Sequence, residues 1–155
     1  MDAVTGAFSY SGAAIATELA RRGKRVRTLT NHPARNPSSL PPALAALEVR
    51  PLSLSDPASL RRSLAGVDTL YNTYWVRFPR GETTFESAVA ASATLITAAV
   101  EAGVRRIVHV SITHADPDSP MATSVARGWW KSTCVRAGSR MPLCAPRSFS
   151  VDTGC

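Results

Sequence analysis

The sequence has little of several features that would place it in a specialised class. Only two of its 18 basic residues are lysines, Lys24 and Lys131, and only 6% of its residues are aromatic. No apolar run approaches the ~20 residues that a transmembrane helix requires. The first residues also lack a positively charged start followed by an apolar stretch, so no secretion signal is evident. These absences predict a protein with no membrane partner, and the cytoplasm is its expected location.

Cysteine is scarce and poorly placed for a metal site or a disulfide framework. All three cysteines, Cys134, Cys144 and Cys155, lie within residues 121–155. None forms a C-x-x-C pair, and no histidine stands at a ligand spacing from them, so no metal is expected. An odd number of cysteines without a secretion signal also disfavours a disulfide framework.

Acidic residues are outnumbered, and the net charge of +7 is one that nucleic-acid-binding proteins share. The basic excess is diffuse, however. Residues 1–120 hold thirteen basic and ten acidic side chains, and residues 121–155 hold five and one. Such a distribution is typical of a solvated surface. A nucleic-acid-binding module is therefore kept only as a less favoured alternative.

What the sequence does have is an alternation of strand and helix patterns in a chain of one domain's length. Strands are expected at residues 3–5, 26–30, 48–52, 67–73 and 105–111. Helices are expected between them, at residues 11–22, at 43–47, from Ser55 or Asp56 to Gly66, and from Thr83 or Thr84 to Ala102. The second strand is indicated by Val26, Thr28 and Thr30, which stand at alternate positions. The order predicts an α/β fold, a Rossmann-type doubly wound parallel sheet with five recognisable strands.

The turn after the first expected strand carries the main functional motif, TGAFSYSG over residues 5–12. A dinucleotide pyrophosphate needs a turn that its oxygens can approach closely and a helix start with free amide groups. Gly6 permits a tight turn because it tolerates positive φ, and Gly12 allows the helix to pack closely on the strand. Ser9 stands at the middle glycine position, where its hydroxyl can donate to phosphate. Since the turn follows a strand and opens an amphipathic helix, it predicts a dinucleotide site rather than an ordinary turn.

The end of the second strand bears on the choice between NAD and NADP. An acidic residue there would bind the ribose 2′-hydroxyl and repel a 2′-phosphate. Thr30, Asn31 and His32 occupy this place, and Arg35 follows shortly after. No carboxylate is present to repel a 2′-phosphate, and Arg35 can pair with that phosphate. NADP is therefore preferred over NAD. A solvated loop arginine is the alternative for Arg35.

These segments resemble the atypical short-chain dehydrogenase/reductase family, in its NmrA-like and NAD(P)-dependent epimerase-like branches. The likeness covers roughly residues 3–120 and rests on residues 4–12, 26–33, 52–64, 66–70 and 103–111. It implies a Rossmann domain that binds NAD or NADP. Members of the family reduce, oxidise or epimerise small substrates, and some only sense the cofactor and bind a protein partner.

The resemblance also implies where the cofactor lies. The residues expected to line the pyrophosphate are Gly6, Ser9, Tyr10, Ser11 and Gly12. At the adenosine end, Arg35 is expected near the 2′-phosphate, with Asn31 at the end of the second strand. Ser53 stands where the family often has an aspartate near the adenine, which puts that contact in doubt, while Leu54 can still pack on the ring.

Two further positions are carried over towards the reacting end of the cofactor. Thr73, at the end of the fourth strand, is expected to face the cofactor ribose. Ser111 ends the fifth strand where the family's catalytic serine lies, with a loop-capping hydroxyl as the alternative. On the same strand, His109 is expected to be a satisfied strand histidine rather than a catalyst. The aromatic residues near the end of the fourth strand are expected to pack at the carboxyl edge of the sheet, beside the cofactor or under the following loop, rather than to stack on bases; they are Tyr71, Tyr74, Trp75 and Phe78.

The proton-transfer pair of the family's reductases is absent from the sequence as written. Those enzymes use a tyrosine general acid with a lysine four residues later, which places both side chains on one helix face. Neither lysine of this chain follows a tyrosine at that distance. Whether the chain is an active enzyme is therefore left open, and its substrate is unknown.

Residues 1–120 are the expected NAD(P)-binding Rossmann domain. Residues 121–155 differ from them in composition and are expected to form an irregular tail. Consider a shifted reading frame in which each new codon takes the third base of one present codon and the first two bases of the next, starting at Met121. In that frame the codons of Met121 and Ala122 can encode only glycine at their junction, and those of Trp129 and Trp130 can encode only valine. The permitted translations include GYFRGKGLVE, which contains Tyr-x-x-x-Lys. The tail is therefore hypothesised to be out of frame, with the C-terminal part of the fold missing; a genuine divergent tail is the alternative.

Three interpretations of function follow. The first is a cofactor-binding domain derived from an NAD(P)-dependent oxidoreductase or epimerase without its catalytic pair. The second is an NmrA-like regulator that senses NADP and binds a protein partner. The third is the nucleic-acid-binding module. If the later strands are missing, the exposed sheet surface is also expected to promote self-association.

Overall fold

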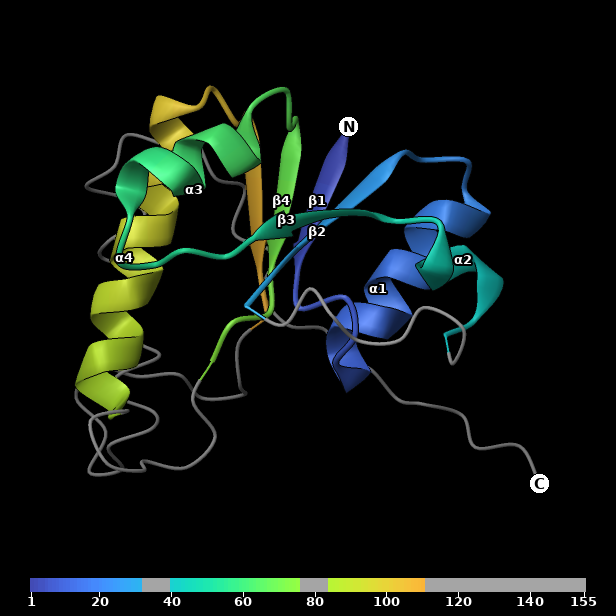
Figure 1. Cartoon of the computed structure of the whole chain (residues 1–155), viewed down its shortest axis with the longest axis horizontal. Helices are drawn as coiled ribbons and strands as arrows, with labels where there is room; N and C mark the ends of the chain where they lie inside the picture. Colours follow the sequence, from blue (N-terminus) through green and yellow to red (C-terminus); the bar gives the residue numbers. More distant parts are fainter. Residues whose placement is uncertain (32–39, 76–83, 111–155) are drawn as a thin grey trace.

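A computed structural model describes residues 1–31, 40–75 and 84–110, and these form a single parallel sheet with helices on both faces (Figure 1). The strands are β1 (Asp2–Thr5), β2 (Val26–Thr30), β3 (Glu48–Pro51), β4 (Thr69–Asn72) and β5 (Arg106–His109). The helices are α1 (Tyr10–Arg21), α2 (Pro42–Ala45), α3 (Pro57–Leu64) and α4 (Phe85–Glu101). The strand order is β3-β2-β1-β4-β5, which confirms the predicted Rossmann-type doubly wound sheet.

The sheet separates two apolar layers, because successive side chains of a strand point to opposite faces. Ala3 of β1 packs with the α3 and α4 side, where the buried side chains include Leu60, Leu64, Leu95 and Ile96. Val4, the next residue, packs with the α1 and α2 side, where the buried side chains include Ala16, Leu19 and Leu44. Figure 1 shows α1 and α2 together beyond one face of the sheet and α3 and α4 beyond the other.

Strand β2 has the predicted bounds, and all five of its residues are buried. The reason is that β2 lies between β1 and β3 with helices over both faces, and such a strand has no solvent side. The alternation of Val26, Thr28 and Thr30 therefore does not separate an inner face from an outer face.

The helix boundaries follow the capping signals of the sequence. Asp56 caps α3 by accepting from the Ser59 amide at 3.0 Å. Thr84 caps α4, and Thr84 and Ser87 satisfy each other's amides as a capping box. Of the paired alternatives in the sequence, the structure thus selects Asp56 over Ser55 and Thr84 over Thr83. In the described parts of the chain, no helix has the length and apolar character needed to cross a bilayer.

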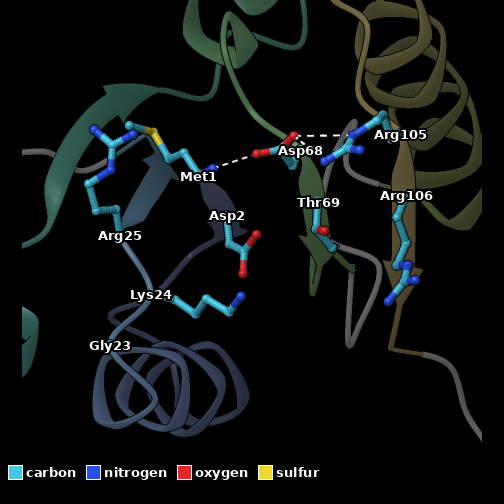
Figure 2. A pocket seen from close by; sticks show the side chains of 9 residues that line it. All are labelled: Met1, Asp2, Gly23, Lys24, Arg25, Asp68, Thr69, Arg105 and Arg106. Carbon is cyan, nitrogen blue, oxygen red and sulfur yellow. Dashed lines mark hydrogen bonds and ion pairs between the residues drawn. The ribbon is translucent and has the colours of Figure 1, made fainter.

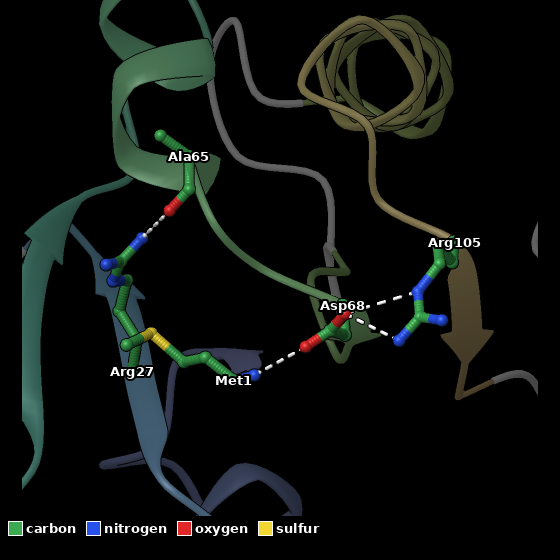
Figure 3. Close-up of polar contacts among 5 residues, drawn as sticks. All are labelled: Met1, Arg27, Ala65, Asp68 and Arg105. Carbon is green, nitrogen blue, oxygen red and sulfur yellow. Dashed lines mark hydrogen bonds and ion pairs between the residues drawn. The ribbon is translucent and has the colours of Figure 1, made fainter.

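The charged side chain of Arg27 is buried in the molecule, where no sequence pattern predicted it. Arg27 of β2 is 7% exposed, and its Nη1 donates to the carbonyl oxygens of Ser63 at 2.8 Å and Ala65 at 2.9 Å. Its Nε lies 3.1 Å from the Glu48 carboxylate. Figure 3 shows the guanidinium reaching the end of α3. Arg27 therefore ties two strands to the carbonyl end of that helix, which carries a partial negative charge.

Candidate functional site

The candidate site lies where β1 and β4 end side by side. After Thr5 the chain enters α1 on one face of the sheet, and the segment after Asn72 leads to α4 on the other face. At such a reversal the two connections diverge and leave a crevice outside the carboxyl ends of the strands. The strand order alone therefore points to this edge.

The turn after β1 has the tight geometry that the motif predicted. Gly6 has φ +63°, in the left-handed region that favours glycine. Its amide donates to Leu29 O at 2.8 Å, and its carbonyl accepts from both the amide of Ser9 at 2.9 Å and the hydroxyl of Ser9 at 2.7 Å. The Ser9 hydroxyl is therefore engaged within the turn, not offered to a ligand as the sequence suggested. The Ala7 amide is also occupied, because it donates to Thr28 Oγ1 at 3.1 Å.

The first turn of α1 is open to an anion. Ser9 is the N-cap but makes no side-chain cap, and the first turn holds no acidic residue. The amides of Tyr10, Ser11 and Gly12 are the first of the helix, and in an α-helix such amides have no acceptor within the helix itself. Tyr10 is 88% exposed and Ser11 is exposed, so their side chains do not fill the space inside the turn. A helix start of this kind favours phosphate oxygens through its amides and its dipole.

Gly12 brings this helix start against the turn. A Cβ built on Gly12 would lie 2.2 Å from Gly6 O and 3.1 Å from the Cα of Ala7, so only glycine fits. The α1 backbone is thus pressed onto the turn, which keeps its first amides at the carboxyl edge. This is the close packing that the motif assigned to Gly12.

A reciprocal pair of hydrogen bonds holds the end of β4 beside this turn. The Thr73 amide donates to Thr5 Oγ1 at 2.7 Å, and the Thr73 hydroxyl donates to Thr5 O at 2.5 Å. Thr73 Oγ1 also lies 3.9 Å from the place where a Cβ of Gly6 would stand. Thr73 therefore borders the turn. Because its hydroxyl proton is used by β1, this hydroxyl could contact a ribose, as predicted for Thr73, only as an acceptor.

The remaining expected site residues are distributed as follows. Asn31 directly follows β2 and is exposed, while Leu54 follows β3 and is partly buried against the core on the α3 and α4 side. Arg35 and Ser111 lie outside the described residues. The structure thus brings Gly6, Ser9, Gly12 and Thr73 into one neighbourhood and places Leu54 after a strand two positions away in the sheet.

Of the aromatic residues after β4, Tyr74 and Trp75 are used in packing, as expected, and Phe78 lies outside the described residues. Tyr74 is partly buried against the core, and this burial raises the pKa of its phenol. Trp75 stacks on Phe85 at the start of α4, with ring centroids 6.1 Å apart and an interplanar angle of 16°. These contacts connect the end of β4 to α4.

Asn72, the last residue of β4, is a residue of this edge that no sequence motif identified. Its side chain is fully buried and contacts groups on both β1 and β5. The signal that could have found it is the polar pair Asn72–Thr73 between the aromatic residues Tyr71 and Tyr74 at the expected strand end. An amide there needs a hydrogen-bonding partner.

A hollow of about 490 Å³ lies at the opposite, amino edge of the sheet (Figure 2). It is lined by Met1, Asp2, Gly23, Lys24, Arg25, Asp68, Thr69, Arg105 and Arg106. Asp68 accepts from the Met1 amine at 2.6 Å and from Arg105 Nη2 at 2.7 Å, as Figure 3 shows, and these two contacts lower the pKa of its carboxyl. Because it lies at the amino ends of the strands, this hollow is not the crevice that the fold reserves for a dinucleotide.

The fold and the turn define a Rossmann-type nucleotide-binding domain, and sequence comparison identifies its family. A family described as NAD(P)H-binding matches residues 6–139, so the chain belongs to that family. The cofactor class expected from the motif is thereby confirmed. No curated protein sequence matches the chain.

Solved structures with the same fold include reductases and an epimerase. The NADP(H) complex of the Citrobacter sp. triphenylmethane reductase is 21% identical, with a TM-score of 0.71 over 89% of this chain and 46% of that chain. The NADPH complex of the Escherichia coli quinone oxidoreductase QOR2 is 24% identical, with a TM-score of 0.69 over 90% and 46%. A nucleoside-diphosphate-sugar epimerase from Staphylococcus aureus is 19% identical, with a TM-score of 0.67 over 89% and 47%.

These likenesses confirm the fold that the resemblance implied. At these identities they carry no assignment of substrate. The chain spans less than half the length of each of these structures.

Proposed function

We propose that this chain binds NADPH at the carboxyl edge of β1 and β4, as the cofactor-binding part of a protein related to oxidoreductases and epimerases. The observation that carries the proposal is the contact between Gly12 and the Gly6 turn, which presents the uncapped first turn of α1 at the carboxyl edge of the sheet. Membership of the NAD(P)H-binding family supports the same ligand. In this arrangement the amides of Tyr10, Ser11 and Gly12 bind the pyrophosphate.

The preference for NADPH over NADH rests on the adenosine end of the site. The end of β2 holds Thr30 and Asn31 and no carboxylate, so a 2′-phosphate meets no like charge there. Arg35 supplies the positive partner in the proposal. The reductases from Citrobacter sp. and Escherichia coli, which share the fold, are complexes with NADP(H) and NADPH.

The proposed function is cofactor binding without the family's tyrosine–lysine chemistry. No lysine of this sequence follows a tyrosine by four residues. Ser111 is proposed as a hydroxyl near the reacting end of the cofactor. It does not replace the tyrosine general acid of the family or the lysine that stabilises the phenolate of that tyrosine. The out-of-frame origin of residues 121–155 is part of this proposal, although the family match continues to residue 139. Codons in the coding DNA that do not fit the shifted translation would end that part.

Calorimetric titration of the purified chain with NADPH and with NADH tests the binding proposal. We expect both to bind, and NADPH to bind more tightly. Replacing Arg35 with alanine should weaken NADPH binding roughly tenfold or more, since a charge-assisted contact contributes about 1.5–3 kcal/mol, and leave NADH binding unchanged. Arg50→Ala, which removes an exposed arginine from β3, is the matched control. A folded chain that binds neither dinucleotide would overturn the proposal.

A further inference from the structure

Asn72 stands at the centre of the carboxyl edge and connects three strands. It is fully buried at the end of β4, between β1 and β5. Its Oδ1 accepts from the Tyr74 amide at 2.9 Å and from Thr5 Oγ1 at 3.3 Å. Its Nδ2 lies 3.1 Å from Nδ1 of His109, the residue opposite it on β5. One amide group therefore links the turn after β4 to the neighbouring strands.

The neighbours of Asn72 allow only one orientation of its amide. The backbone N–H of Tyr74 can only donate, so an oxygen must face it. Thr5 Oγ1 accepts from the Thr73 amide, and the Thr73 hydroxyl donates to Thr5 O, which leaves the Thr5 hydroxyl proton to point at Asn72 Oδ1. Rotating the amide by half a turn would set its NH₂ group against the Tyr74 N–H, which can only donate. The oxygen therefore faces β1 and the NH₂ group faces His109.

This orientation determines the tautomer of His109. A neutral imidazole carries its proton on one nitrogen and accepts on the other. Because the NH₂ group of Asn72 donates, Nδ1 of His109 must accept, and the ring proton must be on Nε2. A proton on Nδ1, in the other tautomer or in the charged ring, would place two donors 3.1 Å apart. The contact with Asn72 thus holds the His109 ring in a single form.

The same contacts shape one wall of the proposed cofactor crevice. They fix the amides of Thr73 and Tyr74, which form the turn after β4. This turn borders Gly6, since Thr73 Oγ1 stands 3.9 Å from the position of a Gly6 Cβ. Without the Asn72 amide, the Tyr74 N–H and the Thr5 hydroxyl would lose their acceptor in a buried place, and the turn would have to move to find another.

From this geometry we propose that Asn72 is a positioning residue for the dinucleotide site, which holds His109 in its Nε2-protonated neutral form and keeps the turn after β4 beside the Gly6 turn. The inference rests on the proposed function for its second half, the effect on NADPH. Its first half, the state of the imidazole, is independent of any ligand. The two halves can therefore fail separately.

Nitrogen-15 NMR of the histidine rings in the full chain tests the first half. The signals of the three histidines, His32, His109 and His114, are assigned with a His109→Asn variant. We expect the neutral Nε2–H tautomer for His109 in the wild-type chain. Asn72→Asp keeps an oxygen towards Tyr74 but offers His109 a carboxylate, so we expect the ring to become doubly protonated. A wild-type Nδ1–H tautomer, or a ring unchanged by Asn72→Asp, would overturn the proposal.

Titration with NADPH tests the second half. We expect Asn72→Leu to weaken NADPH binding roughly tenfold or more, because it removes the acceptor of two buried donors. His109→Asn places an amide oxygen near the position of Nδ1 and should bind within about threefold of wild type, whereas His109→Phe should bind as weakly as Asn72→Leu. If Asn72→Leu does not fold, Asn72→Asp replaces it, since it removes the donor to His109 and should also weaken binding.

Arg27→Met serves as the control for a general loss of stability, because Arg27 is buried away from this edge. It should lower the melting temperature and leave both the His109 signal and the NADPH affinity unchanged. If the wild-type chain does not bind NADPH, the proposed function fails while the NMR result still stands. If wild type binds and folded Asn72 variants bind equally well, the positioning role fails alone.

Discussion

The backbones of Gly12 and Gly6 approach so closely that a single methyl group on Gly12 would lie 2.2 Å from the carbonyl oxygen of Gly6. The contact joins the first turn of α1 to the turn after β1. It explains why glycine is needed at a position whose neighbours are helical and unstrained. The requirement comes from the packing of one turn on another, not from the φ angle of Gly12 itself.

Gly12→Ala is therefore expected to damage both stability and cofactor binding. An overlap of this depth forces the backbone to shift, and overpacking costs about 1–3 kcal/mol or more in the free energy of unfolding. The displaced amides should also lose most of their affinity for NADPH. Urea denaturation and calorimetric titration measure the two effects.

Gly23→Ala is the matched control for this variant. Gly23 has φ +70° and no atom within 4 Å of an added Cβ, so only the conformational cost of about 1–2 kcal/mol remains. It lies at the end of α1 remote from the site, and NADPH affinity should be unchanged. Equal binding by both alanine variants would contradict the role assigned to Gly12.

Arg27→Met should destabilise the domain by about 2–4 kcal/mol. The change leaves the carbonyl oxygens of Ser63 and Ala65 without their donor and Glu48 without its buried partner. Arg50→Met is the control, because Arg50 binds the same carboxylate from an exposed position and should contribute at most about 1 kcal/mol. Denaturant unfolding gives the loss in the free energy of unfolding for both variants, from the shift of the midpoint at unchanged slope. A similar loss of stability in both variants would contradict the argument.

Asp68→Asn is expected to lower the melting temperature at neutral pH and to have little effect in acid. The Met1 amine and Arg105 lower the pKa of the Asp68 carboxyl below its ordinary value of 3.8, so folding favours the ionised form. A lowered folded pKa gives stabilisation that is complete above the unfolded pKa and is lost as the pH falls through the folded pKa.

The wild type and Asp68→Asn should therefore begin to converge as the pH falls below about 3.8 and coincide only below the lowered pKa of the folded state. They should also converge at high salt, because the pair is exposed and screened. Thermal melts between pH 2 and pH 7 measure the difference. Arg105→Gln should act in the same direction as Asp68→Asn, while Arg106→Gln, from the same hollow, should not. A difference that grows in acid would contradict this account.

Thr84→Ala should destabilise α4 by about 1 kcal/mol, because it removes the cap that accepts from the Ser87 amide at 3.1 Å. Thr97→Ala changes an exposed threonine in the middle of the same helix and should be neutral or slightly stabilising, since alanine is the better helix former. Denaturant unfolding of the two variants compares the effect of the N-cap hydrogen bond with the effect of helix propensity within α4. Equal effects would show that the capping box contributes nothing.

Local signals were sufficient for much of the fold. The caps at Asp56 and Thr84 and the stop at Gly23 act through bonds to residues within one turn, so they can be identified from neighbouring residues. The strand boundaries were less certain. The fourth strand begins at Thr69 and not at Val67, because pairing with β1 and β5 decides which residues join the sheet.

Long-range contacts were the part of the site that could not be predicted. The pairs Thr5–Thr73 and Asn72–His109 are separated by 68 and 37 residues, and no local pattern shows that these polar groups meet. Ser9 illustrates the same limit at short range, because its hydroxyl turns back to Gly6 O instead of outward. Burial of Arg27 likewise depends on where α3 ends relative to β2.

The sequence by itself determined the order of strands and helices, their caps, and a glycine turn suited to a dinucleotide. Each of these depends on the conformational preferences of a few adjacent residues. Only the tertiary structure decided which polar side chains share the carboxyl edge, because the order β3-β2-β1-β4-β5 brings together strand ends that are remote in the chain. Because a buried polar group without a partner is costly, the tertiary structure favours contacts among these groups, such as the one between Asn72 and His109.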